Sequence, residues 1–168
     1  MKSYLRLISF FLLICVLFVP GCVLNPVTGE KELIVIPPSE EIALGERTGP
    51  EFEKEFAEKV NSPQLQEYIA EVGAKLAAVS DRPMPYEYAL LSSNIPNAFA
   101  LPGGKIYITV GLFKNMTNER QLAAVLAHET VHIAAEHSVQ GMQRQIGAEL
   151  FAELVAMIVG GESAETAR

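Results

Sequence analysis

Apolar residues recur at helical spacing in two stretches of the N-terminal half of the chain. In "NSPQLQEYIAEVGAKLAAVS", Ser62 suits the N-cap of a helix and Pro63 its first helical position. The apolar face of this helix is formed by Leu65, Ile69, Val72 and Leu76. An earlier helix is expected to start at Ser39 and to run toward Val60, with a kink or break at Gly49-Pro50. Before it, "ELIVI" predicts one short strand.

The hydrophobic period changes to two after residue 85. Residues 86–92, "YEYALLS", predict one strand. Residues 97–113, "NAFALPGGKIYITVGLF", predict two strands around a Pro-Gly-Gly turn. In the second of these, Ile106 and Ile108 share one face, and Tyr107 and Thr109 share the other.

Two apolar helices are predicted in the C-terminal half. In "NERQLAAVLAHETVHIAAEH", Asn118 suits the N-cap and Gln121 is placed to reach back in a capping box. This helix is apolar on nearly every side, which indicates burial. A last helix is expected at about 146–159, ending at Gly160-Gly161. Helices with a small group of strands predict an α+β fold that is mostly helical.

The N-terminus has the pattern of a secretory signal. Lys2 and Arg6 precede an uncharged apolar run over 7–19, which is shorter than the roughly 20 residues of a membrane span. The sequence "VPGC" then resembles a bacterial lipobox, so residues 1–21 are predicted to be a signal peptide and Cys22 the site of lipid attachment. The alternative is an uncleaved signal anchor.

Length and charge narrow the choice of function. The 168 residues fit one domain, and 49% hydrophobic residues suffice for a core. The net charge of −7 argues against nucleic acid as a partner, since phosphate binding requires a basic face. Removal of residues 1–21 would leave 11 basic and 20 acidic residues, a charge of −9, and a single cysteine that has no partner for an internal disulfide.

The stretch "HETVH" carries the candidate chemistry. His128 and His132 are four residues apart, so on a helix both imidazoles can hold one metal ion. Glu129 lies about 100° round the axis from His128, beside a metal-bound water whose proton it can take. The motif predicts zinc-dependent peptide hydrolysis. The alternative is a pair of hydrogen-bonded histidines in a helix core.

His137 is expected to be a hydrogen-bonding or exposed histidine. It is five residues after His132, about 140° further round a continuous helix, where it cannot easily reach the same metal. The metzincin pattern places a third histidine six residues after the second, and that position is Ser138, with Ala135 in place of the glycine.

Three stretches together resemble the zinc metallopeptidases of family 48, the HtpX-like and Oma-like group, particularly its bacterial lipoprotein branch. They are "GCVLNPVTGEKELIVIPPSEEIALGE" (21–46), "NAFALPGGKIYITVGLF" (97–113) and "ERQLAAVLAHETVHIAAEHSVQ" (119–140). The resemblance implies a gluzincin fold, one zinc per chain on His128 and His132, and Glu129 as the catalytic base.

The resemblance also implies where substrate binds and how the chain divides. The strand around 106–110, with Ile106 and Ile108, is expected to be the edge strand along which an extended polypeptide lies. Asn97 and Ala98 are expected at the mouth of the cleft. Residues 22–38 would be an N-terminal linker, and residues 39–168 the N-terminal part of the catalytic domain.

The family's third zinc ligand is a glutamate on a later helix, in a pattern like ExxAD. No such pattern follows the HExxH in this sequence, so the ligand is expected beyond Arg168 and the chain is expected to be truncated. The glutamates that remain as substitutes are Glu149, Glu153, Glu162 and Glu165.

These observations predict a membrane-anchored zinc metalloendopeptidase that acts on misfolded or misassembled cell-envelope proteins. Because Val23 rather than aspartate follows Cys22, the lipid anchor is expected in the outer membrane, facing the periplasm. Two alternatives stay open: a non-catalytic assembly factor or chaperone-like module with an incomplete metal site, and a structural lipoprotein without metal.

Overall fold

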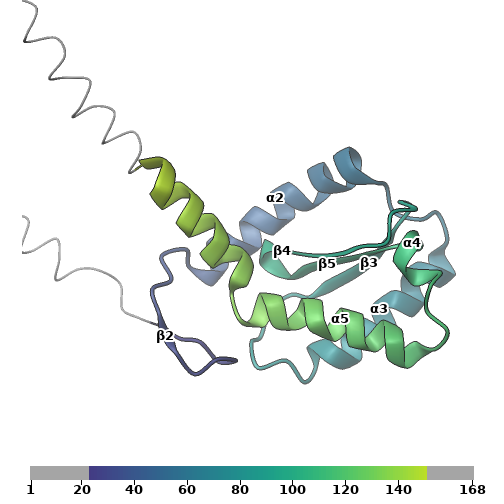
Figure 1. The fold of residues 1–168 in the computed structure, drawn as a ribbon, viewed down its shortest axis with the longest axis horizontal. Helices are drawn as coiled ribbons and strands as arrows, with labels where there is room; N and C mark the ends of the chain where they lie inside the picture. Colours follow the sequence, from purple (N-terminus) through teal and green to yellow (C-terminus); the bar gives the residue numbers. More distant parts are fainter. Residues whose placement is uncertain (1–22, 151–168) are drawn as a thin grey trace, which may run out of the picture.

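Helices enclose a small mixed sheet in the computed structural model, which describes residues 23–150 (Figure 1). The helices are α2 (Pro38–Phe56), α3 (Pro63–Ala77), the single turn α4 (Val110–Phe113) and α5 (Glu119–Ala134). The strands of the sheet are β3 (Glu87–Leu91), β4 (Ala98–Leu101) and β5 (Lys105–Thr109). Residues 137–150 are also helical and follow α5 after a turn. The α+β class and the mostly helical character are confirmed.

The strand order is β3-β5-β4, with β5 in the centre. Strand β5 pairs with β3 in parallel, Tyr88 opposite Ile106, and with β4 antiparallel, Phe99 opposite Tyr107. The expectation that Ile106 and Ile108 lie on an edge strand is therefore wrong. Both β5 flanks are occupied by strands, and both side chains are fully buried, so a peptide cannot add to this strand.

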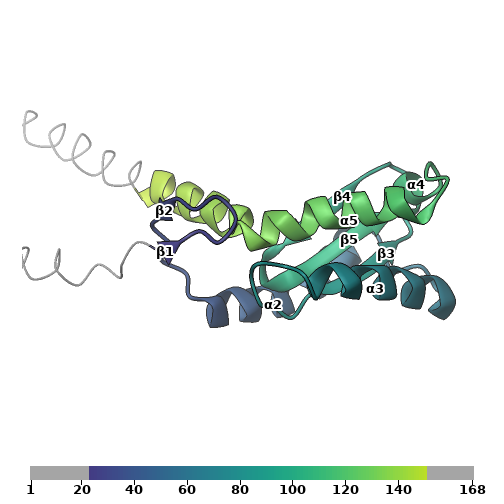
Figure 2. The ribbon, with the colours of Figure 1, turned by 90° about the horizontal axis from the view of Figure 1, so that it is seen from below.

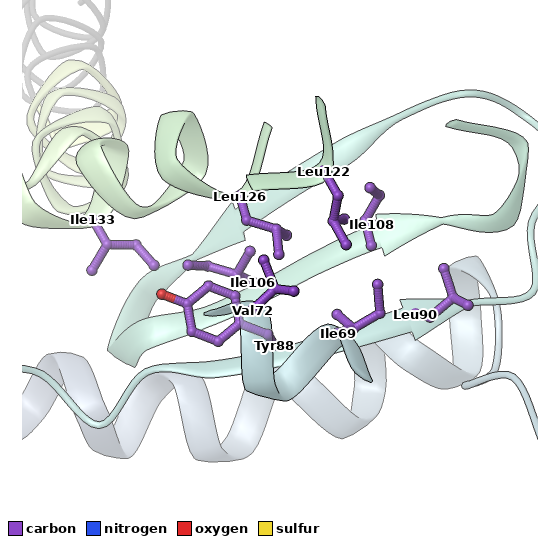
Figure 3. Close-up of a cluster of buried hydrophobic side chains, with 9 residues drawn as sticks. All are labelled: Ile69, Val72, Tyr88, Leu90, Ile106, Ile108, Leu122, Leu126 and Ile133. Atoms are coloured by element: carbon purple, nitrogen blue, oxygen red, sulfur yellow. The ribbon is translucent and has the colours of Figure 1, made fainter. Parts of the chain in front are cut away.

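The two faces of the sheet are covered by different helices. Figure 1 shows α3 and α5 on one side of the strands and α2 on the other, and in Figure 2, which looks from below, α3 and α5 run in front of the strands. Between them lies the main core, which Figure 3 draws: Ile69, Val72, Tyr88, Leu90, Ile106, Ile108, Leu122, Leu126 and Ile133. Of the predicted face of the second helix, Ile69 and Val72 lie in this core and Leu76 packs against it, whereas Leu65 is 36% exposed. The predicted face of the strand at 105–109 is confirmed. Each large aliphatic side chain buried here contributes about 1.5–3 kcal/mol.

Helix α2 covers the opposite face through aromatic packing. The Phe52 ring lies 5.1 Å from Phe99 and 5.5 Å from Tyr107, centroid to centroid. At the other end of α2, Gly45 lies so close to the Pro102 carbonyl that an added Cβ would come within 2.1 Å of its oxygen. This close approach fits α2 against the turn Pro102–Gly104, in which Gly103 and Gly104 both have positive φ.

Two of the four predicted helix starts are confirmed. Ser62 and Asn118 cap α3 and α5 through their side chains, as expected. The cap of α2 is Pro37 rather than Ser39, and no side chain caps that end. Helix α2 continues through Pro50 and stops at Phe56. The helix expected at 146–159 begins at 137 instead, and its part beyond 150 lies outside the described residues.

The segment predicted as a linker contains a small antiparallel pair, β1 (Val23–Leu24) and β2 (Lys31–Glu32). Asn25 follows β1 and is completely buried. Its amide donates to the Ala135 carbonyl at 3.0 Å and to the Glu32 carboxylate at 2.9 Å. The pair therefore contacts the C-terminal end of α5 directly. Among residues 23–150, no helix has both the length and the apolar character to cross a membrane.

Candidate metal centre

Helix α5 carries the three residues of the predicted site. Asn118 accepts a hydrogen bond from the Gln121 amide at its start, and the Gln121 side chain accepts from the Thr117 amide. The predicted capping box is thus present, but the Gln121 side chain bonds the amide of Thr117 instead of the amide of the N-cap residue Asn118. Leu122, Leu126 and Ile133 anchor the inner face of the helix in the core. His128 is exposed and His132 is half-buried, so their face of α5 is open.

The two imidazoles converge as the spacing predicts. His128 Nε2 and His132 Nε2 lie 3.1 Å apart, with ring centroids at 4.6 Å and nearly perpendicular planes. Two nitrogens that bind one tetrahedral zinc at about 2.0–2.1 Å are separated by about 3.3 Å. The observed separation fits a shared metal ion with only a small adjustment of side-chain torsions.

Glu129 is half-buried on the same helix, one residue beyond His128. Its neighbour Thr130 points to the core, where its hydroxyl donates to the Leu126 carbonyl at 2.7 Å and meets the Tyr88 hydroxyl at 3.0 Å. The Tyr88 contact fixes the rotation of α5 against the sheet. That rotation decides which way the HExxH residues face. Burial raises the pKa of Tyr88, so this hydroxyl stays protonated.

His137 contacts the opposite edge of His132. Its Nδ1 lies 2.7 Å from His132 Nδ1, whereas His132 turns its Nε2 to His128. The expectation of a hydrogen-bonding or exposed histidine is confirmed, since His137 is both. Across residues 23–150, no three side chains of the ligand types gather into one metal-binding group.

The proposed substitutes for a third ligand are not brought to the histidines in the described part of the chain. Glu149 is exposed on the helical segment 137–150 and belongs to no metal-binding group there. Glu153, Glu162 and Glu165 lie outside the described residues, as does Cys22.

Sequence reasoning missed a buried ion cluster at the C-terminal end of α5. The Arg82 guanidinium bonds Glu41 at 2.7 Å and Glu136 at 2.8 Å, and it donates to the Ile133 carbonyl at 3.1 Å. All three charged side chains are at most 9% exposed. Burial raises the pKa of Glu136, against the opposing effect of Arg82. These residues are far apart in sequence, so no local pattern connects them.

The edge of the sheet beside α5 is β4. The Thr109 amide donates to the Asn97 carbonyl, which makes this pair hydrogen-bonded and directs the backbone groups of Ala98 and Ala100 away from β5. Ser138 confirms this direction, because its hydroxyl donates to the Ala100 carbonyl at 3.1 Å. The edge that β4 exposes therefore runs beside the turn that follows the HExxH helix.

Comparison with known proteins gives a consistent result. The sequence model of Peptidase family M48 matches residues 63–168. The beta-barrel assembly-enhancing protease of Escherichia coli is 34% identical over 87 residues, which are 51% of this chain and 18% of that protein. The mitochondrial metalloendopeptidase OMA1 of Schizosaccharomyces pombe is 34% identical over 98 residues, 56% of this chain and 29% of the relative. The OMA1 metalloendopeptidase of Bos taurus is 26% identical over 148 residues, 83% of this chain and 28% of the relative. The chain thus spans less than a third of the length of these relatives.

Proposed function

Because this chain belongs to peptidase family M48, we propose that it is a zinc-dependent endopeptidase, with His128 and His132 as metal ligands and Glu129 as general base. The observation that supports this most strongly is the 3.1 Å approach of the two Nε2 atoms on a helix face that is open. The fold that holds them is proposed to be of the gluzincin type. One zinc per chain is expected.

Each group of the proposed site has a separate role in peptide hydrolysis. When bound, zinc supplies Lewis acidity that polarises the scissile carbonyl. The Glu129 carboxylate takes the proton of the attacking water and delivers it to the leaving amine. The Tyr88–Thr130 contact holds α5 so that these groups face the substrate together.

We propose that an extended polypeptide adds to the edge of β4. Ala98 and Ala100 direct backbone groups outward, and Asn97 lies at the start of this edge. An added strand gains main-chain hydrogen bonds whatever its sequence, which suits an enzyme that acts on unfolded segments. Asn97 and Ala98 therefore remain proposed substrate contacts. Ile106 and Ile108 lie on β5, the strand that pairs with the inner side of β4.

The physiological setting is proposed from the N-terminal sequence and the relatives. Lipid attachment at Cys22, after removal of residues 1–21, would place the enzyme in the cell envelope, on the outer membrane and facing the periplasm. The Escherichia coli relative is a beta-barrel assembly-enhancing protease, and on this ground we propose envelope proteins in assembly as substrates. Incorporation of a labelled fatty acid that is abolished by Cys22→Ser would support the anchor, and unchanged labelling would contradict it.

The central test compares three variants for zinc content and casein cleavage. Glu129→Gln should retain zinc and lose cleavage, since the amide binds no proton at working pH. His132→Ala should lose both zinc and cleavage. Glu71→Gln, an exposed change on α3, should resemble the wild type. Wild-type cleavage by Glu129→Gln would refute the proposed mechanism.

The third ligand is tested in the same assay. We propose a glutamate that follows the HExxH helix. Zinc bound by the product of the whole reading frame, but not by residues 22–168 alone, would place this ligand beyond Arg168. Tight zinc in residues 22–168 would direct mutagenesis to Glu149, Glu153, Glu162 and Glu165.

A further inference from the structure

All three histidines of the chain lie in one row at the end of α5. His128 Nε2 is 3.1 Å from His132 Nε2, and His132 Nδ1 is 2.7 Å from His137 Nδ1. His132 is the middle member and uses a different ring nitrogen toward each neighbour. The ring nitrogen of His132 that carries the proton therefore decides whether His132 donates or accepts toward each of its two neighbours.

His137 reaches His132 only because α5 ends in a specific turn. Helix α5 ends at Ala134, and Glu136 has the left-handed value φ 58° before the chain becomes helical again at residue 137. Such a conformation costs roughly 1–2 kcal/mol for a residue with a side chain. On a continuous helix His137 would point well away from His132.

Three contacts from distant parts of the chain hold this turn. Arg82 bonds the Glu136 carboxylate and the Ile133 carbonyl. Asn25, from the N-terminal β1–β2 segment, donates to the Ala135 carbonyl. The turn that places the His137 side chain is thus held both by Arg82 and by Asn25. The position of His137 is therefore specified by the fold.

The hydrogen-bond direction between His132 and His137 follows from the chemistry of ligation. A neutral imidazole carries its proton on one nitrogen and has a lone pair on the other. If His132 Nε2 is to bind a metal, that nitrogen must be bare, so the proton of His132 must be on Nδ1. His137 Nδ1 is the atom in reach of that proton, and it must then be the acceptor.

We propose that His137 is a positioning residue: it accepts the Nδ1–H of His132, fixes its tautomer and ring orientation, and so presents Nε2 for metal binding. The inference rests on the proposed function for its consequence, but the hydrogen bond exists independently of the metal. Partners of this kind typically change metal affinity about 10–100-fold when removed.

The first experiment reads the tautomers without metal. Histidine-selective ¹⁵N labelling yields signals from these three residues alone. In mildly alkaline, metal-free buffer, long-range proton–nitrogen spectra should show His132 protonated on Nδ1 and His137 protonated on Nε2. His137→Ala should move His132 toward a mixture of tautomers. The reverse assignment in the wild type, with His137 Nδ1 as donor, would overturn the proposal.

The second experiment measures zinc affinity by competition with a chelating dye. His137→Ala should bind zinc about 10–100-fold more weakly than the wild type. His137→Asn should recover most of this loss, because Oδ1 is attached to Cγ just as Nδ1 is and can accept the same proton. His137→Gln places its acceptor one bond further out and should recover less. Equal affinity of His137→Ala and the wild type, or equal loss in His137→Asn and His137→Ala, would overturn the positioning role.

Failure of the wider proposal is distinguishable from failure of this one. Absence of zinc binding by the product of the whole reading frame would refute the proposed function, while the tautomer spectra would still decide the hydrogen bond. Thermal unfolding of each variant, compared with the wild type, separates loss of the turn from loss of the acceptor: a folded His137→Ala with weakened zinc binding supports the proposal.

Discussion

Arg82 is the single cation of a buried cluster with two carboxylates, Glu41 and Glu136. Its removal leaves both acids buried without a counter-charge, so we expect Arg82→Ala to lower the free energy of unfolding by about 3–5 kcal/mol. Lys75→Ala removes a cation from the exposed pair with Glu119 and should cost at most about 1 kcal/mol. Urea denaturation of both variants measures the difference. Equal losses would show that the buried cluster is no more stabilising than a surface pair.

Glu136 should make stability depend on pH in a specific direction. Burial raises its pKa above the ordinary 4.5, so the folded chain binds this proton more tightly than the unfolded chain. The stability it contributes is present below that ordinary value and is lost as the pH rises through the folded-state pKa. Glu136→Gln removes this titration. Relative to the wild type, the variant should therefore gain stability as the pH rises above the ordinary value of 4.5.

Denaturant midpoints of the wild type and Glu136→Gln at several pH values test this sign. A difference between them that is constant with pH, or that shifts in favour of the wild type as pH rises, would contradict the prediction. The exposed Glu71→Gln is the matched control, because it removes the same chemical group from α3.

At the scale of residues, local spacing predicted that the two candidate metal ligands converge, but it did not predict the residues that hold the end of their helix. His128 and His132 are one turn apart on the same helix, so periodicity alone predicted that their Nε2 atoms would converge. Arg82 bonds Glu136 and Ile133 across more than 50 residues of sequence, and Asn25 bonds Ala135 across 110. Only the tertiary fold brings them together, and no pattern in a single sequence identifies such partners.

At the scale of elements, most helices and strands were predictable, but their order in the sheet was not. The run at 97–113 indicates a β4–β5 hairpin, since it combines alternation with a Pro-Gly-Gly turn. That β3 then pairs with the far side of β5, in parallel, is a non-local choice. Both faces of β5 are buried, and its pattern of apolar residues does not show whether the strand lies at the centre or at the edge of the sheet. The error on Ile106 and Ile108 followed from this.

The fit of α3 onto the sheet leads to a prediction at Gly73. A Cβ there would lie 2.2 Å from ring atoms of Tyr88, the residue whose hydroxyl meets Thr130 on the HExxH helix. Helix propensity alone predicts a gain of roughly 0.5–1 kcal/mol for Gly73→Ala. We expect overpacking to outweigh it, with a net loss of about 1–3 kcal/mol. Gly147→Ala, where nothing lies within 4 Å, should instead stabilise. Thermal unfolding of both variants tests the opposite signs, and stabilisation by Gly73→Ala would contradict this packing.

At the scale of the whole molecule, the β1–β2 segment joins the start of the described chain to the end of the HExxH helix. The sequence predicted a linker between the proposed lipid anchor at Cys22 and the catalytic domain. Instead, Asn25 is buried against Ala135, within three residues of His132. The proposed membrane attachment at Cys22 would thereby be connected to the candidate metal centre through a short, hydrogen-bonded path. Asn25 and Ala135 are 110 residues apart, so no local pattern in the sequence identifies this contact.

Asn25 therefore provides the last prediction. Its amide bonds Ala135 and Glu32, and its Oδ1 accepts from the Val27 and Thr28 amides, so Asn25→Ala removes both the turn and its attachment to α5. We expect a loss of about 1–3 kcal/mol, because the partner groups are left without their bonds. Amide exchange should accelerate in β1–β2 and at the end of α5 together, while β3 and β5 keep their protection. Thr28→Ala, an exposed change in the same turn, is the control. If exchange rose in β1–β2 alone, the N-terminal segment would merely rest on the domain; a joint rise would show that it helps to hold the turn that carries His137 beside His132.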